Sequence, residues 1–285
     1  MKKYSKGLYA AAEKNKVLIS SHRGQAGTNI IENTVPAFKN ALLHGADIVE
    51  MDIAMSTDGK YYTFHDGNEM RLLRTEKNIR TMTSKEIENL DYYNYEGMKS
   101  GGKVNRFEDV LKELKGKCFI NIDRCWDLKW RDFNYPLGAF ELIRKYGMEE
   151  QIIYKTNINE YYLSQMSEHG VDLMYMPIVS SSEDVEKAES YGLNIVALEL
   201  LFPTEDNPII NDGNLAAWHD KGYLLWANSI NVYDDFILSG GHDDVHAIKE
   251  GTEAWDFLLD KGIDIIQTDW PAVLKNYLNG KFRQA

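Results

Sequence analysis

The chain has 285 residues, of which 44% are hydrophobic and 27% are charged, the usual balance for a globular protein. Its 32 Lys and Arg residues against 44 Asp and Glu residues give a formal net charge of −12. This charge argues against nucleic acid or an anionic membrane as the main partner, because both are bound by basic surfaces. The two cysteines are too few for a disulfide framework or a cysteine-rich zinc site.

The N-terminal sixteen residues contain no apolar run long enough for a signal peptide. No stretch approaches the roughly 18 apolar residues of a membrane helix, so we expect no membrane insertion. The chain as given is expected to be cytoplasmic, or periplasmic or secreted if a leader was removed. A small anionic substrate remains compatible with the acidic charge if a metal ion or a few cationic side chains supply local positive charge.

Short apolar runs recur along the chain and alternate with stretches of helical spacing, such as Val35, Phe38, Ala41 and Leu42. Eight such runs are expected to be strands: 17–21, 47–53, 118–123, 151–155, 171–179, 194–200, 222–228 and 263–269. Eight alternating strands and helices in one chain of this length predict a (β/α)8 TIM-type barrel forming a single domain over 1–285. A doubly wound open sheet is the alternative, although no GxGxxG motif follows the first strand.

About 50 residues separate the second run from the third. This interval holds YYTFHD, a polar stretch rich in Arg and Asn, and a short helix near 83–90. We interpret residues of about 67–105 as a small insertion over the catalytic face.

Polar side chains stand where the predicted strands end, which is where a barrel of this kind carries its active site. They are His22, Glu50, Asp52, His65, Asp123, Arg124, Lys155, Glu199, Trp226, Asn228 and Asp269. We therefore expect these groups to converge on one rim of the barrel.

Glu50 and Asp52 are two residues apart, so on a strand they project to the same face. Such a pair either is balanced by Arg or Lys, or holds a divalent metal, with Asp123 as a third ligand from the next barrel strand. All-oxygen ligands favour Mg²⁺ or Ca²⁺ over zinc. His22 and His65 flank the pair, and imidazoles suit a reaction in which one group removes a proton and another donates one.

Several motifs together resemble the glycerophosphodiester phosphodiesterase family. They are His22-Arg23-Gly24, Glu32-Asn33-Thr34, Glu50-Met51-Asp52, Thr57-Asp58-Gly59, His65-Asp66 and the closing Gly262-Ile263-Asp264 with Thr268-Asp269 and Pro271. The resemblance implies a barrel that hydrolyses glycerophosphodiesters to glycerol 3-phosphate and an alcohol. It implies one divalent cation held by Glu50 and Asp52, acid and base roles for His22 and His65, and phosphate binding by Arg23. Trp226 would line the substrate site, and Glu32 and Asn33 would complete the binding rim.

The chain departs from the family pattern at the end of the third barrel strand. The family usually has Glu-x-Lys there, whereas this chain has Asp123-Arg124-Cys125. Lys155, one strand later, is our preferred replacement for the lysine, and Arg124 is the alternative. We expect this departure to affect which alcohol group the substrate carries more than the class of reaction.

Two other functions share the same residues. A phospholipase D-like lyase acting on choline-bearing lipids would need an apolar, membrane-facing rim, and the net charge and polar loops argue against one. A barrel that binds a phosphate ester without turnover would explain the missing lysine, but has no need of two proton-transfer groups. Asp243 and Asp244, in SGGHDDVH, could meet a cationic head group or a polyol, or belong to an ordinary solvated loop. The oligomeric state is left undetermined.

Overall fold

The computed structural model describes residues 2–125, 134–231 and 236–283. Eight parallel strands form its centre: β1 (Leu18–Ser21), β2 (Ile48–Met55), β5 (Phe119–Asp123), β6 (Ile152–Thr156), β7 (Met174–Val179), β8 (Ala197–Leu200), β9 (Leu224–Asn228) and β10 (Ile265–Thr268). Each pairs with the next, and β1 pairs with both β10 and β2, so the sheet closes on itself. The closure confirms the predicted (β/α)8 barrel and excludes the open doubly wound sheet.

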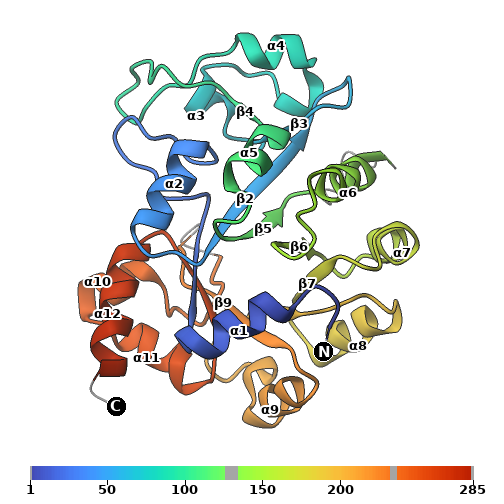
Figure 1. Cartoon of the computed structure of the whole chain (residues 1–285). Coiled ribbons are helices and arrows are strands. Elements are labelled where there is room, and N and C mark those ends of the chain that lie inside the picture. Colours follow the sequence, from blue (N-terminus) through green and yellow to red (C-terminus); the bar gives the residue numbers. More distant parts are fainter. Residues whose placement is uncertain (1, 126–133, 232–235, 284–285) are drawn as a thin grey trace.

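Helices surround the barrel and bury its outer face (Figure 1). They are α2 (Val35–Leu43), α5 (Phe107–Leu114), α6 (Asn134–Tyr146), α7 (Glu160–His169), α8 (Ser182–Ser190), α9 (Asp212–Asp220), α10 (Asp244–Glu250), α11 (Glu253–Asp260) and α12 (Pro271–Arg283), with the 3₁₀ helix η3 (Pro208–Ile210) before α9. The apolar faces of α5 and its neighbours pack on alternate strand residues to form the largest core cluster. None of the helices within the described ranges is both long and apolar enough to cross a bilayer.

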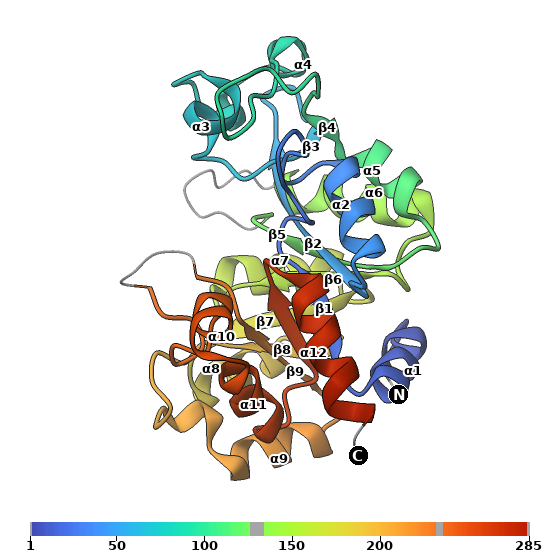
Figure 2. The same cartoon turned by 90° about the vertical axis from the view of Figure 1, so that its left-hand side faces the viewer.

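The N-terminal helix α1 (Lys6–Asn15) closes one end of the barrel. Leu8 and Ala12 pack on residues at the amino ends of the strands, among them Leu18, Ile48 and Leu224. Figure 2 shows α1 on one side of the molecule and α3 and α10 on the other, where the carboxyl ends of the strands open. The open end is therefore the one that carries the predicted polar rim.

The excursion between β2 and β5 has a small apolar core of its own. Strands β3 (Tyr61–Thr63) and β4 (Asn105–Arg106) extend β2 as an antiparallel sheet, and α3 (Glu69–Leu73), η1 (Ile79–Thr81) and α4 (Ser84–Asn89) lie between them. Tyr62, Phe64, Leu72, Ile79 and Ile87 are among the residues of this second core. The segment 67–105, predicted as an insertion, corresponds to the part of this excursion that follows β3. That the excursion and the barrel form a single domain over 1–285 stays a prediction.

Candidate active site

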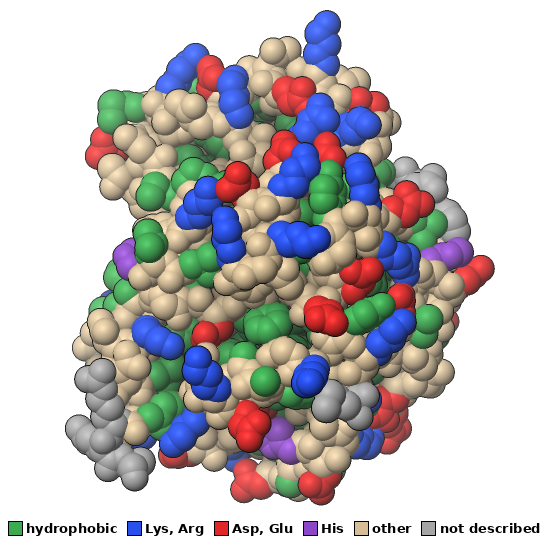
Figure 3. Space-filling view, viewed as in Figure 1, with side chains coloured by type: hydrophobic (Ala, Val, Ile, Leu, Met, Phe, Trp, Pro, Cys, Tyr) green, Lys and Arg blue, Asp and Glu red, His purple; other side chains and the backbone are tan. Residues whose placement is uncertain are grey.

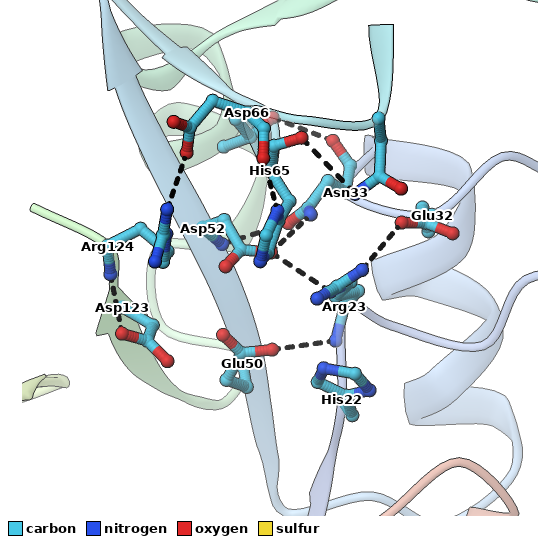
Figure 4. Close-up of polar contacts among 12 residues, drawn as sticks. His22, Arg23, Glu32, Asn33, Glu50, Asp52, His65, Asp66, Asp123 and Arg124 are labelled. Atoms are coloured by element: carbon cyan, nitrogen blue, oxygen red, sulfur yellow. Dashed lines mark hydrogen bonds and ion pairs between the residues drawn. The ribbon is translucent and has the colours of Figure 1, made fainter. Parts of the chain in front are cut away.

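Three carboxylates meet at the carboxyl ends of β2 and β5 (Figure 4). The two strands pair in parallel with Asp52 opposite Asp123, and Glu50 lies two residues earlier on the same face of β2. One oxygen from each of Glu50, Asp52 and Asp123 lies within 4.8 Å of the others. Glu50 and Asp52 are only 1% and 2% exposed. The barrel thus brings together the three residues predicted as metal ligands.

The charges of this cluster are unevenly balanced. Arg23 Nε lies 3.1 Å from Asp52 Oδ2 and lowers the pKa of Asp52 in spite of burial. Lys155 Nζ lies 2.9 Å from Asp123 Oδ2. Glu50 accepts the backbone N–H of Arg23 at 2.8 Å, but among the described residues it has no ion pair. Burial, and then the neighbouring Asp52, raise the pKa of Glu50.

A buried carboxylate without a counter-ion is costly unless a cation answers it. The all-oxygen donor set and the uncompensated Glu50 therefore fit a hard divalent cation such as Mg²⁺ or Ca²⁺. The alternative considered above, a pair balanced by a cationic side chain, holds for Asp52 but not for Glu50 in the part of the chain that the structure describes.

The loop after β1 folds back to hold Arg23 and Asp52 in place. Asn33 donates from Nδ2 to Asp52 Oδ2 at 2.8 Å and accepts the backbone N–H of Asp52 at 3.0 Å. Glu32 accepts from Arg23 Nη1 at 3.0 Å. Arg23 and Asn33 adopt positive φ angles of 53° and 57° to make this reversal. Asn33 is almost fully buried and supports Asp52, whereas Glu32 lines a cavity.

The two predicted histidines are oriented through the same ring atom. His22 Nδ1 lies 2.9 Å from Asp269 Oδ1, and His65 Nδ1 lies 2.7 Å from the carbonyl oxygen of Asp66. Because both partners are acceptors, Nδ1 carries the hydrogen and Nε2 is left to exchange a proton. Burial lowers the pKa of His22, but the hydrogen bond to Asp269, together with the negative charges of Asp269 and Glu50, outweighs burial, and the net effect is a raised pKa. The sequence placed Asp269 among the polar residues at strand ends and in the closing motif, but it gave no role to Asp269 and no pairing with His22.

Lys155 is the cation beside the third carboxylate. It is 3% exposed, and its Nζ lies 2.9 Å from Asp123 and 3.0 Å from Glu199 Oε2. Arg124 instead pairs with Asp66, its Nη2 lying 3.0 Å from Asp66 Oδ1. This geometry favours Lys155 over Arg124 as the replacement for the missing lysine.

Trp226 does not occupy the position predicted for it. It is fully buried inside the barrel, and it is absent from the residues that line the cavity. Its Nε1 donates to Asn228 Oδ1 at 2.9 Å, and Asn228 Nδ2 donates to Glu199 Oε1 at 2.7 Å. Trp226 therefore has a supporting role in place of the predicted substrate contact. Through Asn228 it holds the Glu199 carboxylate, which pairs with Lys155.

Removing the Lys155 charge is expected to destabilise the fold. Lys155→Met leaves Asp123 and Glu199 without their shared counter-ion, and breaking a buried ion pair costs about 3–5 kcal/mol. Urea unfolding of the metal-free protein measures this loss, and adding Glu199→Gln should recover part of it. Lys112→Met, which breaks an exposed pair with Asp109, is the control and should cost at most about 1 kcal/mol. Equal losses in the two single variants would contradict the role given to Lys155.

Two cavities meet at the first histidine. The larger, of about 670 Å³, is lined at one end by His22, Arg23, Asp52, His65, Asp123, Arg124 and Lys155, and at the other by apolar side chains of β7 and of the loops after β6, β8 and β9. The smaller, of about 430 Å³, is lined by Gln25, Glu32, Arg71, Tyr95, Asp269 and Trp270. His22 and Arg23 line both. A two-armed substrate centred on Arg23 would thus find room on either side.

Asp244 fixes the end of β10, and so the residue that orients His22. Its carboxylate accepts from Thr268 Oγ1 at 2.8 Å, from the backbone N–H of Asp269 at 2.7 Å and from Ser229 Oγ at 3.0 Å. Asp243 accepts the backbone N–H of His246 and caps α10. Asp244 is therefore buried support for the rim, unavailable to the cationic head group or polyol considered from the sequence.

Asp244 is expected to make stability fall as pH rises. Burial raises its pKa to about 7 despite the hydrogen bonds. Between about pH 4 and 7 the folded state keeps a proton that the unfolded state releases, so the free energy of unfolding decreases through this window, by up to roughly 4 kcal/mol. Urea unfolding at pH 4.5 and 7.5 should show a flatter dependence for Asp244→Asn. Asp243→Asn removes the same charge one residue earlier and should keep the slope of the native protein.

Comparison with known proteins points in the same direction as the geometry. The model of the glycerophosphoryl diester phosphodiesterase family matches residues 22–194, and that of a domain of unknown function matches residues 175–278. A glycerophosphodiester phosphodiesterase of Bacillus altitudinis is 37% identical over 89% of this chain and 94% of its own length. The lysophospholipase D GDPD1 of Homo sapiens is 30% identical over 91% of this chain and 85% of its own.

Solved structures share the fold. A glycerophosphoryl diester phosphodiesterase from Parabacteroides distasonis has a TM-score of 0.73 at 18% identity, covering 93% of this chain and 86% of its own. An Oleispira antarctica phosphodiesterase, solved in complex with the product sn-glycerol-3-phosphate, has a TM-score of 0.70 at 16% identity, covering 94% and 99%. The matched family model and the curated relatives identify this chain as an enzyme of the glycerophosphoryl diester phosphodiesterase family, as the sequence motifs predicted.

Proposed function

We propose that this enzyme is a metal-dependent phosphodiesterase that releases glycerol 3-phosphate and an alcohol through acid–base catalysis by His22 and His65. The observation that carries the proposal is the shared cavity: both imidazoles, Asp52 and Asp123 line it, and Glu50 lies within 4.8 Å of the two carboxylates. A site that only bound a phosphate ester would not require two imidazoles with Nε2 free to exchange protons.

Glu50, Asp52 and Asp123 would hold the divalent ion, which supplies Lewis-acid polarisation of a phosphoryl oxygen when bound. Arg23 lines the cavity beside them and offers a guanidinium to the phosphate, while Glu32 fixes its orientation. Lys155 pairs with Asp123 at 2.9 Å and holds this carboxylate beside the cluster. The cationic groups thus supply the local positive charge that an anionic substrate needs in a chain of net charge −12.

The histidines divide the proton transfers. One Nε2 takes the proton of the attacking glycerol hydroxyl, and the other gives a proton to the departing alcohol oxygen, which leaves a cyclic phosphodiester. In a second step the roles reverse: one imidazole takes a proton from a water that attacks the phosphorus, the other protonates the glycerol oxygen released as the ring opens, and glycerol 3-phosphate results. Asp269 and the Asp66 carbonyl oxygen engage Nδ1 of the two rings, which leaves Nε2 of each for these transfers. Each transfer contributes roughly 10²–10⁴-fold in rate.

The test is release of glycerol 3-phosphate from a panel of glycerophosphodiesters in Mg²⁺, in Ca²⁺ and in EDTA. Turnover that requires metal is expected, and the panel identifies the preferred head group. Full activity in EDTA would contradict the metal assignment. Metal binding without turnover of any diester would favour the non-catalytic phosphate-ester barrel.

The phospholipase D-like alternative is favoured by one observation, the apolar half of the large cavity, which includes Ile178, Val179 and Leu201. The similarity to a human lysophospholipase D supports including lysophosphatidylcholine in the panel. Phosphorus NMR of the products separates the two reactions, because a hydrolase ends at a phosphate monoester and a lyase at a cyclic diester.

A further inference from the structure

Exposed apolar side chains gather at the open end of the barrel. Eleven large hydrophobic residues of the described ranges are exposed, and only Leu43 and Val171 follow the carboxyl ends of helices, at the end of the barrel opposite the cavities. The other nine lie on segments that follow carboxyl ends of strands, and we call them the apolar rim: Met70, Tyr95, Met98, Phe236, Ile237, Val245, Ile248, Trp270 and Val273. Such segregation is unlike the single, scattered apolar residues of an ordinary surface.

The apolar rim is continuous with both cavities. Phe236 lines the larger one together with Ile230 and Leu238, and Tyr95 and Trp270 line the smaller one. The wall of the larger cavity also includes Ile158, Ile178, Val179 and Leu201, with Asn157, Asn159, Ser180 and Asp184 as polar neighbours. Apolar side chains therefore cover part of the cavity wall between Arg23 and the protein surface.

We propose that this enzyme acts on substrates held in a zwitterionic lipid surface, on which the apolar rim docks while the acyl chain of the diester lies along the apolar wall. The inference deepens the proposed phosphodiesterase function and rests on it. Tyr95 and Trp270 combine an apolar ring with a polar group, the combination favoured at membrane–water interfaces. The net charge of −12 would be repelled by an anionic lipid surface, so we propose a surface of net-neutral, zwitterionic lipid as the partner.

The rest of the surface is different in character. Figure 3 views the molecule as Figure 1 does, from the side on which α1 covers the barrel, and charged side chains are spread over that face among smaller groups of apolar ones. The residues of the apolar rim follow the carboxyl ends of strands, at the end of the barrel that opens to the cavities. The structure thus has an apolar rim although the sequence argued against one. The sequence does not reveal it because its members come from four separate segments and form no long apolar run in the chain.

The binding experiment uses vesicles of phosphatidylcholine with lysophosphatidylcholine, and flotation measures the bound fraction. The rim variant is Met98→Ser/Ile237→Ser/Ile248→Ser, and the matched control is Leu43→Ser/Val171→Ser at the opposite end. Each rim residue is about half exposed, so the loss of apolar contact should weaken binding at least about tenfold. The control should bind like the native protein, and phosphatidylserine in the vesicles should weaken binding for all three.

Turnover separates docking from chemistry. Hydrolysis of soluble glycerophosphocholine should be equal in the three proteins, whereas hydrolysis of lysophosphatidylcholine micelles should fall in the rim variant alone. Failure of the native protein to bind vesicles, or equal binding by the rim variant, would overturn the inference. A native dimer that only the rim variant dissociates would assign the apolar rim to a second copy of the chain. If no diester is hydrolysed, the proposed function fails, and flotation still decides whether the apolar rim docks.

Discussion

Glu50→Gln is expected to remove metal-stimulated turnover, lowering kcat by roughly 10²–10⁴-fold at a Mg²⁺ concentration that saturates the native enzyme. The reason is that Glu50 is the one carboxylate of the cluster without a cationic side chain in the described ranges, so a bound ion depends on it most. Polarisation by a metal contributes several kcal/mol to a transition state, and each 1.36 kcal/mol is tenfold in rate. Isothermal titration of Mg²⁺ into the variant measures the accompanying loss of affinity.

The same variant should have the opposite effect on the metal-free protein. Burial and the neighbouring Asp52 raise the pKa of Glu50 to about 8, so the metal-free protein takes up a proton on folding near neutral pH. Glutamine is neutral without that cost, so the melting temperature in EDTA should rise, while the gain on adding Mg²⁺ should vanish. Glu186→Gln, at an exposed position on α8, is the control and should change neither value. A metal-induced gain that survives in Glu50→Gln would place the ion elsewhere.

His22→Ala and His65→Ala are each expected to lower kcat by roughly 10²–10⁴-fold while the metal-induced gain in melting temperature is kept. The rings face the cavity but are not part of the carboxylate cluster, so proton transfer is lost without loss of the ion. Because the two act on one reaction, the double variant should be only slightly slower than the worse single variant. Rates are measured by the release of glycerol 3-phosphate.

His44→Ala is the matched control for these variants. His44 is exposed beyond the end of α2 and lines neither of the two cavities, so its replacement should leave kcat and KM unchanged. Asp269→Asn should give a smaller loss than His22→Ala and shift the pH dependence of kcat to lower pH, because the carboxylate that raises the pKa of His22 is gone. A native pH profile in Asp269→Asn would contradict a positioning role for Asp269.

The sequence alone determined the barrel and the identity of most polar groups in the large cavity. Eight apolar runs spaced by amphipathic stretches specify eight buried parallel strands, because each such strand must be covered by a helix before the chain returns. Once strands are placed, their carboxyl ends meet at one face, which predicts that Glu50, Asp52 and Asp123 meet without knowledge of any distance. The two-residue period of a strand is enough to put Glu50 and Asp52 on one side.

Only the tertiary structure decided which side chains pair with each other through hydrogen bonds and ion pairs. Asp269 reaches His22 across 247 positions of the chain, and Lys155 reaches Glu199 on a strand that is not its immediate neighbour in the barrel. Trp226 lies in the middle of β9 and packs in the filled interior of the barrel. The alternation of residues along a strand shows which of them face inward, but not whether an inward side chain meets a cavity or a packed core.

The apolar rim likewise results from bringing together residues that are far apart in the sequence. Its residues are spread over short helices and loops of four segments, so neither hydropathy nor net charge reveals them, and only closure of the sheet brings these segments to one end of the barrel. Local patterns report the elements because a residue's neighbours in sequence fix its backbone geometry and the face it occupies. Partners distant in sequence are set by register and closure of the barrel, which no local pattern encodes.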